Sequence, residues 1–95
     1  MKAKLIIHNK VIDELGNTIE IKLWEVEKSS DKPHGYKYSL VYIANTQRVI
    51  GYDNAEQKGD HRHYGCRTKP YLFTGTEQLI KDFYGDIVSY NRRKR

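Results

Sequence analysis

The 95-residue sequence has few of the residues that mark disulfide-rich, membrane-spanning or multidomain proteins. Its single cysteine, Cys66, excludes an internal disulfide and a zinc cluster built from several cysteines, and it fits a reducing compartment. No segment approaches the roughly 18 apolar residues of a membrane span, and the short apolar run in residues 1–7 does not resemble a signal peptide. We therefore expect a cytoplasmic protein with one domain at residues 1–91 and a basic tail at residues 92–95.

Positive charge is in excess, but it is concentrated at the C-terminus. The 17 Lys and Arg residues exceed the 12 Asp and Glu residues and give a net charge of +5. The last four residues are all Lys or Arg, so the rest of the chain has a net charge of only +1. A basic tail attracts polyanions such as RNA without providing specificity. Any basic patch on the folded body must come from local arrangement.

Alternating apolar and polar residues predict antiparallel strands in the first two thirds of the chain. The clearest alternation places Ile19, Ile21 and Leu23 on one face of a strand. Asn45 and Thr46 form a tight turn between two later strands. The predicted strands are residues 5–12, 18–27, 36–43 and 47–52, with short extended segments at 61–64 and 71–73 as candidates for a fifth.

One helix is predicted after the strands. Thr74 and Glu77 have the spacing of a capping box. The apolar residues that follow at helical spacing are Leu79, Ile80, Phe83, Tyr84, Ile87 and Val88. We predict an α+β fold in which an antiparallel sheet of four to five strands, beginning with an N-terminal hairpin, packs on this C-terminal helix through the face of Ile19, Ile21 and Leu23. Whether the tyrosine-rich face of residues 36–43 also lies under the helix stays open.

The densest polar cluster, residues 58–64, contains two histidines in an His-x-His arrangement. In an extended strand, His61 and His63 point the same way with Cβ atoms about 6–7 Å apart, and this separation can bracket one phosphate group. A neutral imidazole can take the 2′-hydroxyl proton of RNA while a protonated one donates to the leaving 5′-oxygen. These residues are therefore the predicted catalytic pair, and the reaction needs no metal or other cofactor.

Neighbouring residues are candidates for holding RNA. Cleavage builds negative charge on the phosphoryl oxygens, and a lysine or arginine must stabilise it. Tyr52 could stack on a base and Asn54 could hydrogen-bond to one. The predicted substrate-binding residues are Lys37, Tyr52, Asp53, Asn54, Lys58, Asp60, Arg62 and Tyr64.

Other interpretations of the same residues remain open. The histidines could lie on a solvated strand with no chemistry, in a module that binds RNA or protein through its tyrosines and its basic tail. Alternatively, Asp60, His61 and His63 could bind a metal ion, with Asp53 as a further ligand. This set lacks the spacing of familiar zinc motifs.

Three motifs, in this order, resemble the TumE family of small toxins from prokaryotic toxin–antitoxin pairs. They are PHGYKYSL at residues 33–40, GYDN at 51–54 and KGDHRH at 58–63. The similarity extends from the first hairpin to the region of Phe73 and Phe83. It implies a bacterial or archaeal cytosolic toxin whose partner is a helix-turn-helix antitoxin. Combined with the histidine chemistry, it predicts a metal-independent endoribonuclease that acts on RNA; a homodimer is left open.

Overall fold

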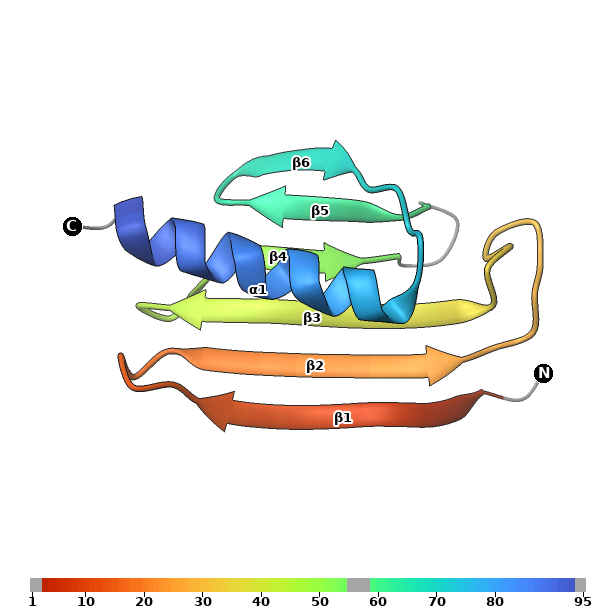
Figure 1. Cartoon of the computed structure of the whole chain (residues 1–95), viewed down its shortest axis with the longest axis horizontal. Helices are drawn as coiled ribbons and strands as arrows, with labels where there is room; N and C mark the ends of the chain where they lie inside the picture. The colour runs from red at the N-terminus through yellow and green to blue at the C-terminus, as the bar shows by residue number, and fades with distance from the viewer. Residues whose placement is uncertain (1–2, 55–58, 94–95) are drawn as a thin grey trace.

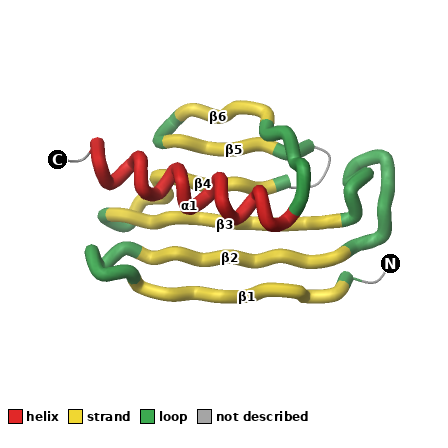
Figure 2. Tube along the Cα trace, in the orientation of Figure 1, coloured by secondary structure: helices red, strands yellow, loops and turns green. Residues whose placement is uncertain are grey.

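The computed structural model describes residues 3–54 and 59–93 as a six-stranded antiparallel sheet followed by one helix (Figure 1). The strands are β1 (Lys4–Ile12), β2 (Thr18–Glu25), β3 (Tyr36–Ala44), β4 (Gln47–Asp53), β5 (His61–Tyr64) and β6 (Arg67–Pro70), and the helix is α1 (Thr76–Arg93). The order of the strands in the sheet is their order in the chain. Figure 2 shows α1 lying along one face of this sheet. Among the described residues, no helix has the length and apolar character needed to cross a membrane.

The α+β class, the antiparallel sheet and the C-terminal helix are confirmed, but the predicted number of four to five strands is wrong. The strand that the sequence did not reveal is β6, whose four residues are polar or proline and are all exposed. It therefore has no apolar alternation to recognise. Residues 71–73, a candidate fifth strand, follow β6 without forming a strand. A short polar strand at the sheet edge also discourages pairing with other chains.

Tight turns set the register of the hairpins. Asn45 and Thr46 both have positive φ, 53° and 64°, as in the type I′ turns that match the twist of paired strands. Gly65, with φ 62°, lies in the turn between β5 and β6. Between β4 and β5, the strand pairing places Asp53 opposite His61.

The core lies between the sheet and α1. The helix contributes Leu79, Phe83 and Ile87, which recur every four residues along one side. The sheet residues of the core are Ile19, Ile21, Leu23, Tyr38, Leu40, Tyr42, Ile50 and Tyr52. The predicted packing face on β2 is therefore in the core, and the tyrosine-rich face of β3 lies there with it. Tyr84 and Val88, predicted as part of the apolar side of the helix, are exposed.

The boundaries of α1 differ from the expected ones at both ends. The helix begins at Thr76, and the backbone N–H of Leu79 donates to the carbonyl oxygen of Gly75 at 3.0 Å. Gly75 is therefore the N-cap residue of the helix, the role predicted for Thr74. At the other end the helix continues to Arg93, so the first two residues of the predicted tail are helical. Residues 94 and 95 lie outside the described part of the chain.

A β-bulge in β4 changes the direction of one side chain. Tyr42 of β3 pairs with Ile50, but the next residue, Ile43, pairs with Arg48, so Val49 is an extra residue. Strict alternation would place Arg48 on the same face as the buried Ile50. The bulge instead turns Arg48 toward the face of the sheet that α1 does not cover.

Candidate functional site

The histidines of β5 lie on the sheet face away from α1. Alternation along β5 places His61 and His63 on that face, with their ring centroids 4.8 Å apart. It places Arg62 and Tyr64 on the helix face, where Arg62 contacts Asp86 of α1. The cluster that is continuous in sequence is thus divided between the two faces of the sheet.

One carboxylate contacts both histidines. Asp53, at the end of β4, has Oδ1 2.7 Å from His61 Nε2 and Oδ2 3.3 Å from His63 Nε2. The position of Asp53 follows from the β4–β5 register, which pairs it directly with His61. Asp53 therefore orients the two rings relative to each other.

The outer ring nitrogens of the histidines face different partners. His61 Nδ1 lies 3.1 Å from the carbonyl oxygen of Gly59, which can only accept. With Asp53 at Nε2, both nitrogens of His61 face acceptors, an arrangement that suits a doubly protonated ring. His63 Nδ1 lies 3.0 Å from Thr68 Oγ1, a hydroxyl that can donate. His63 can therefore be neutral, accepting at Nδ1 and donating from Nε2 to Asp53.

Arg48 is a component of the site that sequence reasoning missed. Burial lowers the pKa of His63 below its usual value of 6.5, and the nearby positive charge of Arg48 lowers it further, while Asp53 opposes both effects. A Cβ atom added at Gly51 would lie 3.1 Å from Arg48 Cδ and 3.5 Å from His63 Cδ2. The glycine thus leaves Arg48 and His63 close together. Arg48 reaches this face because of the β4 bulge. The alternation of apolar and polar residues in the sequence does not reveal such a bulge.

Two hollows lie on the histidine face. The histidines line an open groove of about 450 Å³. Its other lining residues are Asp60, Thr68, Lys69 and Pro70. A hollow of about 280 Å³ is lined by Asp53 together with Trp24 and Lys37, and Lys37 Nζ lies 5.7 Å from the centroid of the Trp24 ring. Lys37 is therefore on the same face as the histidines, as a phosphate-binding role would require.

Tyr52 and Asn54 do not contribute to this face, and their buried side chains leave no exposed group for the predicted base contacts. Tyr52 is 0% exposed, and its hydroxyl donates to Asp86 at 2.6 Å. Asn54 is 1% exposed; its side chain accepts from the backbone of Tyr38 at 3.0 Å and donates to the backbone of Tyr36 at 2.7 Å. Both polar groups are used inside the protein, so neither reaches a base.

The other predicted substrate-binding residues are also dispersed. Arg62 cannot hold a phosphate between the histidines, because it lies on the helix face with its guanidinium 2.6 Å from Asp86 Oδ1. Tyr64 is on that same face. Asp60 lines the histidine groove, but its carboxylate accepts from the Tyr38 hydroxyl at 2.6 Å and contacts His34. Lys58 lies outside the described residues.

The three motifs meet at one end of the sheet. Asp60, from the third motif, contacts His34 and Tyr38 of the first motif. Asn54, from the second motif, bonds to the first through the backbone of Tyr36 and Tyr38. The motif residues thus form a polar network beside the histidine groove, and several of them position β5 instead of facing outward.

The model of the protein family described as toxin TumE matches residues 2–91 of the chain. The chain belongs to the TumE toxin family. The resemblance suggested by the three motifs is thereby confirmed. In this TumE-family chain the match runs from before β1 to near the end of α1, so it includes the histidine groove and the motif network. Neither the curated proteins nor the solved structures contain a significant match.

The histidine groove of this TumE-family chain also has the composition of a metal site. One ligand atom from each of Asp53, His61 and His63 can be chosen so that all three lie within 4.8 Å of one another. Two imidazoles and a carboxylate suit Zn²⁺ and other first-row divalent metals. This set differs from the predicted one because Asp53 takes the place of Asp60.

Proposed function

We propose that this chain is the toxin of a prokaryotic type II toxin–antitoxin pair and that it is an endoribonuclease using His61 and His63 without a metal ion. One observation carries the catalytic part of the proposal. Asp53 contacts both rings, while their outer nitrogens face a carbonyl in one case and a hydroxyl in the other. This arrangement supports two different protonation states in neighbouring histidines, as acid–base catalysis requires.

In the proposed reaction, the 2′-hydroxyl of RNA replaces the Thr68 hydroxyl at His63 Nδ1. His63 accepts its proton as the 2′-oxygen attacks phosphorus. His61 donates a proton to the 5′-oxygen as the bond between that oxygen and phosphorus breaks. The products are a 2′,3′-cyclic phosphate and a free 5′-hydroxyl. Asp53 keeps both rings oriented throughout.

Positive charge near His63 supports the same step. Negative charge develops on the non-bridging phosphoryl oxygens during attack, and a preorganised cation stabilises it. The β4 bulge and the absence of a side chain at Gly51 leave Arg48 close to His63, which supports this role for Arg48. Lys37, on the far side of Asp53, is a second cation on this face.

The grouping of Asp53, His61 and His63 favours a second candidate, a metal-dependent nuclease. A metal ion held by these residues would polarise a phosphoryl oxygen or lower the pKa of a bound water. Hydrolysis by a metal-activated water gives no 2′,3′-cyclic phosphate. Two measurements therefore distinguish the metal-dependent from the metal-independent nuclease: the sensitivity of cleavage to a chelator and the chemical groups at the ends of the RNA products.

The proposed partners are RNA and a cognate helix-turn-helix antitoxin, and the proposed location is the cytoplasm. Membership of a toxin family supports the antitoxin, and the cationic residues on the described surface support RNA. A homodimer remains an alternative assembly. The alternative of a non-catalytic module that grips RNA through the tyrosine-rich face of β3 loses support, because Tyr38 and Tyr42 are buried under α1.

The test is to express the chain and its His61→Ala/His63→Ala double variant in a bacterial host and to examine growth and total RNA after induction. His8→Ala is the matched control, because His8 is half exposed on β1 and outside the groove. Growth arrest with fragmented RNA from the parent and the control, but not from the double variant, supports the proposal. Arrest without fragmentation, or arrest by all three proteins, contradicts it.

Purified protein then decides between the two chemistries. We expect cleavage to persist with a chelator, to leave 2′,3′-cyclic phosphate ends, and to stop when a 2′-deoxy nucleotide replaces the ribonucleotide at the cleaved position. Loss of cleavage with the chelator and its recovery with Zn²⁺ or Mn²⁺ would instead favour the metal-dependent nuclease.

A further inference from the structure

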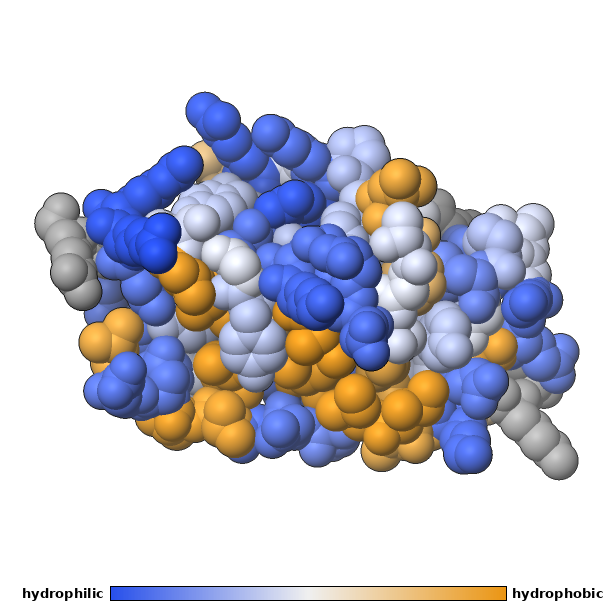
Figure 3. All heavy atoms as spheres, viewed as in Figure 1, coloured by the Kyte–Doolittle hydropathy of each residue, from blue (hydrophilic) through white to orange (hydrophobic). Residues whose placement is uncertain are grey.

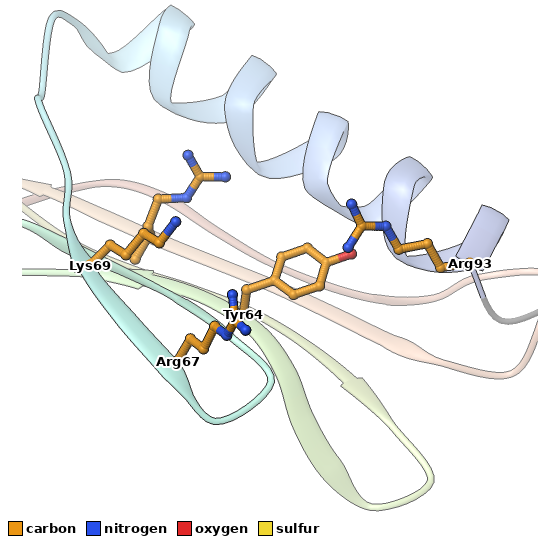
Figure 4. A pocket seen from close by; sticks show the side chains of 5 residues that line it. Tyr64, Arg67, Lys69 and Arg93 are labelled. Atoms are coloured by element: carbon orange, nitrogen blue, oxygen red, sulfur yellow. The ribbon is translucent and has the colours of Figure 1, made fainter.

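A cationic pocket lies on the opposite side of the β5–β6 hairpin from the histidine groove. It has a volume of about 260 Å³ and is formed by the hairpin and the last turn of α1. Its lining residues are Arg62, Tyr64, Arg67, Lys69 and Arg93. Figure 4 shows Lys69, Arg67 and Arg93 around the Tyr64 ring. In Figure 3 the hydrophilic surface toward the C-terminal end of α1 contrasts with the apolar surface nearer β1 and β2.

The charge balance of this pocket favours an anion. Four of its five lining residues are cationic and none is acidic. Arg62 is partly neutralised by Asp86, whereas Arg67 and Lys69 form no ion pair with a described acidic residue. The C-terminal carbonyls of α1 carry a partial charge of about −0.5, which the full positive charges outweigh.

Tyr64 supplies a polar group that also lacks a partner. Its hydroxyl oxygen is buried and has no hydrogen-bond partner among the described residues. The guanidinium carbon of Arg93 lies 5.8 Å from the centroid of the Tyr64 ring, so the cation covers the ring. A buried hydroxyl is expected to be hydrogen-bonded. An anionic oxygen that enters between Arg93 and Arg67, with a shift of the Arg93 side chain from the Tyr64 ring, would accept from this hydroxyl.

Lys69 connects the cationic pocket with the histidine groove. It lines both hollows, and it lies on β6, the exposed edge strand. A nucleic-acid strand that crosses this four-residue edge can therefore place one phosphate between the histidines and another in the cationic pocket.

We infer that the pocket of Arg62, Tyr64, Arg67, Lys69 and Arg93 binds a second phosphodiester of a single-stranded RNA that passes over β6 from the histidine groove. The identity of the ligand as substrate RNA rests on the proposed function. A single strand is favoured because a duplex cannot bend around one short strand, whereas single-stranded RNA can follow a cationic path. The pocket thus selects flexible RNA and holds it in register with the histidines.

Binding without cleavage tests this inference independently of catalysis. The probe is a fluorescent single-stranded RNA with 2′-O-methyl groups throughout, and the measurement is its Kd by anisotropy at several salt concentrations. The test variant is Arg67→Ala/Arg93→Ala. The control is Lys81→Ala/Arg92→Ala, which loses the same charge at exposed positions outside the pocket.

We expect the pocket variant to weaken binding roughly 10-fold or more near 0.1 M salt and to reduce the slope of log K against log salt by about 1.4. The control should change Kd by less than twofold, and a duplex of the same sequence should bind more weakly than the single strand. Equal losses in both double variants, or no loss in the pocket variant, would overturn the inference. So would a pocket variant that binds RNA normally but fails to bind the antitoxin.

Tyr64→Phe sharpens the test because it removes only the hydroxyl. Since that hydroxyl has no partner in the described structure, the melting temperature should not fall. RNA affinity should fall about 10-fold, the effect expected of a hydrogen bond to a charged oxygen. Unchanged affinity would exclude the hydroxyl as a ligand. If the parent protein binds the probe through the pocket but does not cleave unmodified single-stranded RNA, the proposed nuclease fails while the binding site stands.

Discussion

His34 Nε2 lies 2.9 Å from Asp60 Oδ2, although the two residues are 26 positions apart in the chain. The backbone N–H of Tyr36 donates to His34 Nδ1 at 3.1 Å, so Nε2 carries the ring hydrogen and donates to Asp60. The Tyr38 hydroxyl donates to the same carboxylate oxygen at 2.6 Å. Asp60 immediately precedes His61. These bonds therefore hold the start of β5, and with it the proposed catalytic strand, against the loop before β3.

Replacing Asp60 should destabilise the protein through this network. Asp60→Ala removes the acceptor for both His34 and Tyr38 and leaves the buried Tyr38 hydroxyl unpaired. We expect the free energy of unfolding, measured with urea, to fall by about 1–3 kcal/mol. Tyr38→Phe is the control and should cost less, because it removes the hydroxyl together with its requirement for a partner. A loss in Asp60→Ala no larger than in Tyr38→Phe would contradict this role.

The pH dependence of cleavage should report the environment of His63. Its pKa lies below 6.5 because of burial and of the charge on Arg48, so the neutral base persists below that pH. The acidic limb of kcat/KM should therefore lie below pH 6.5. Arg48→Ala should move this limb toward higher pH, whereas Arg48→Lys should leave it in place. If the acidic limb does not move in Arg48→Ala, the charge of Arg48 does not lower the pKa of His63.

The same pKa shift has a consequence for stability, with a defined sign. The unfolded state takes up a proton near pH 6.5, whereas folded His63 takes it up only at lower pH. Between these values the unfolded state binds more protons, so stability should decline as the pH falls below about 6.5. His63→Gln should reduce the steepness of that decline in urea titrations. If stability declines just as steeply in His63→Gln, groups other than His63 cause the decline.

The spacing of apolar residues predicted those parts of the fold that depend on a single strand or helix. The alternation of Ile19, Ile21 and Leu23 identified the buried face of β2, and the period of the C-terminal segment identified α1. The His-x-His spacing was enough to place both rings on one face once β5 was extended. In each case the burial of one face or the pleat of one strand determined the result.

The parts that could not be predicted depend on relations between elements. The polar strand β6 is held by pairing with β5 and has no apolar pattern of its own. The bulge that turns Arg48 is visible only in the pairing of β3 with β4. Tyr52 and Asn54 have polar groups typical of recognition, and only the packed structure shows that these groups are satisfied inside.

The core predicts a clear contrast between two leucines. Leu79 is 0% exposed on the inner side of α1, whereas Leu72, seven residues earlier, is 82% exposed. Leu79→Ala should lower the free energy of unfolding by about 2–5 kcal/mol, since it removes buried methyl groups and leaves a cavity. Leu72→Ala should change it by no more than about 0.5 kcal/mol. Similar urea midpoints for the two variants would mean that α1 does not pack as described.

Gly51→Ala tests the space between Arg48 and His63 without removing any charge. The added methyl carbon would lie 3.1 Å from Arg48 Cδ and 3.5 Å from His63 Cδ2, next to the arginine proposed to stabilise the phosphoryl oxygens. Gly51 does not have positive φ, so alanine fits the backbone, and the exposed Arg48 chain can move aside. Stability should therefore change by less than about 1 kcal/mol. Cleavage should fall by up to about 100-fold, because the phosphate is displaced.

Gly85→Ala is the matched control for this last prediction. A Cβ atom at Gly85 meets no other atom within 4 Å, and the residue lies within α1, away from the histidine face. Alanine there should stabilise the helix by roughly 0.5–1 kcal/mol and leave cleavage unchanged. The informative comparison is the ratio of cleavage rates in the two folded variants. If Gly51→Ala cleaves RNA as fast as Gly85→Ala, the reacting phosphate does not lie between Arg48 and His63, and the proposed position of the substrate is wrong.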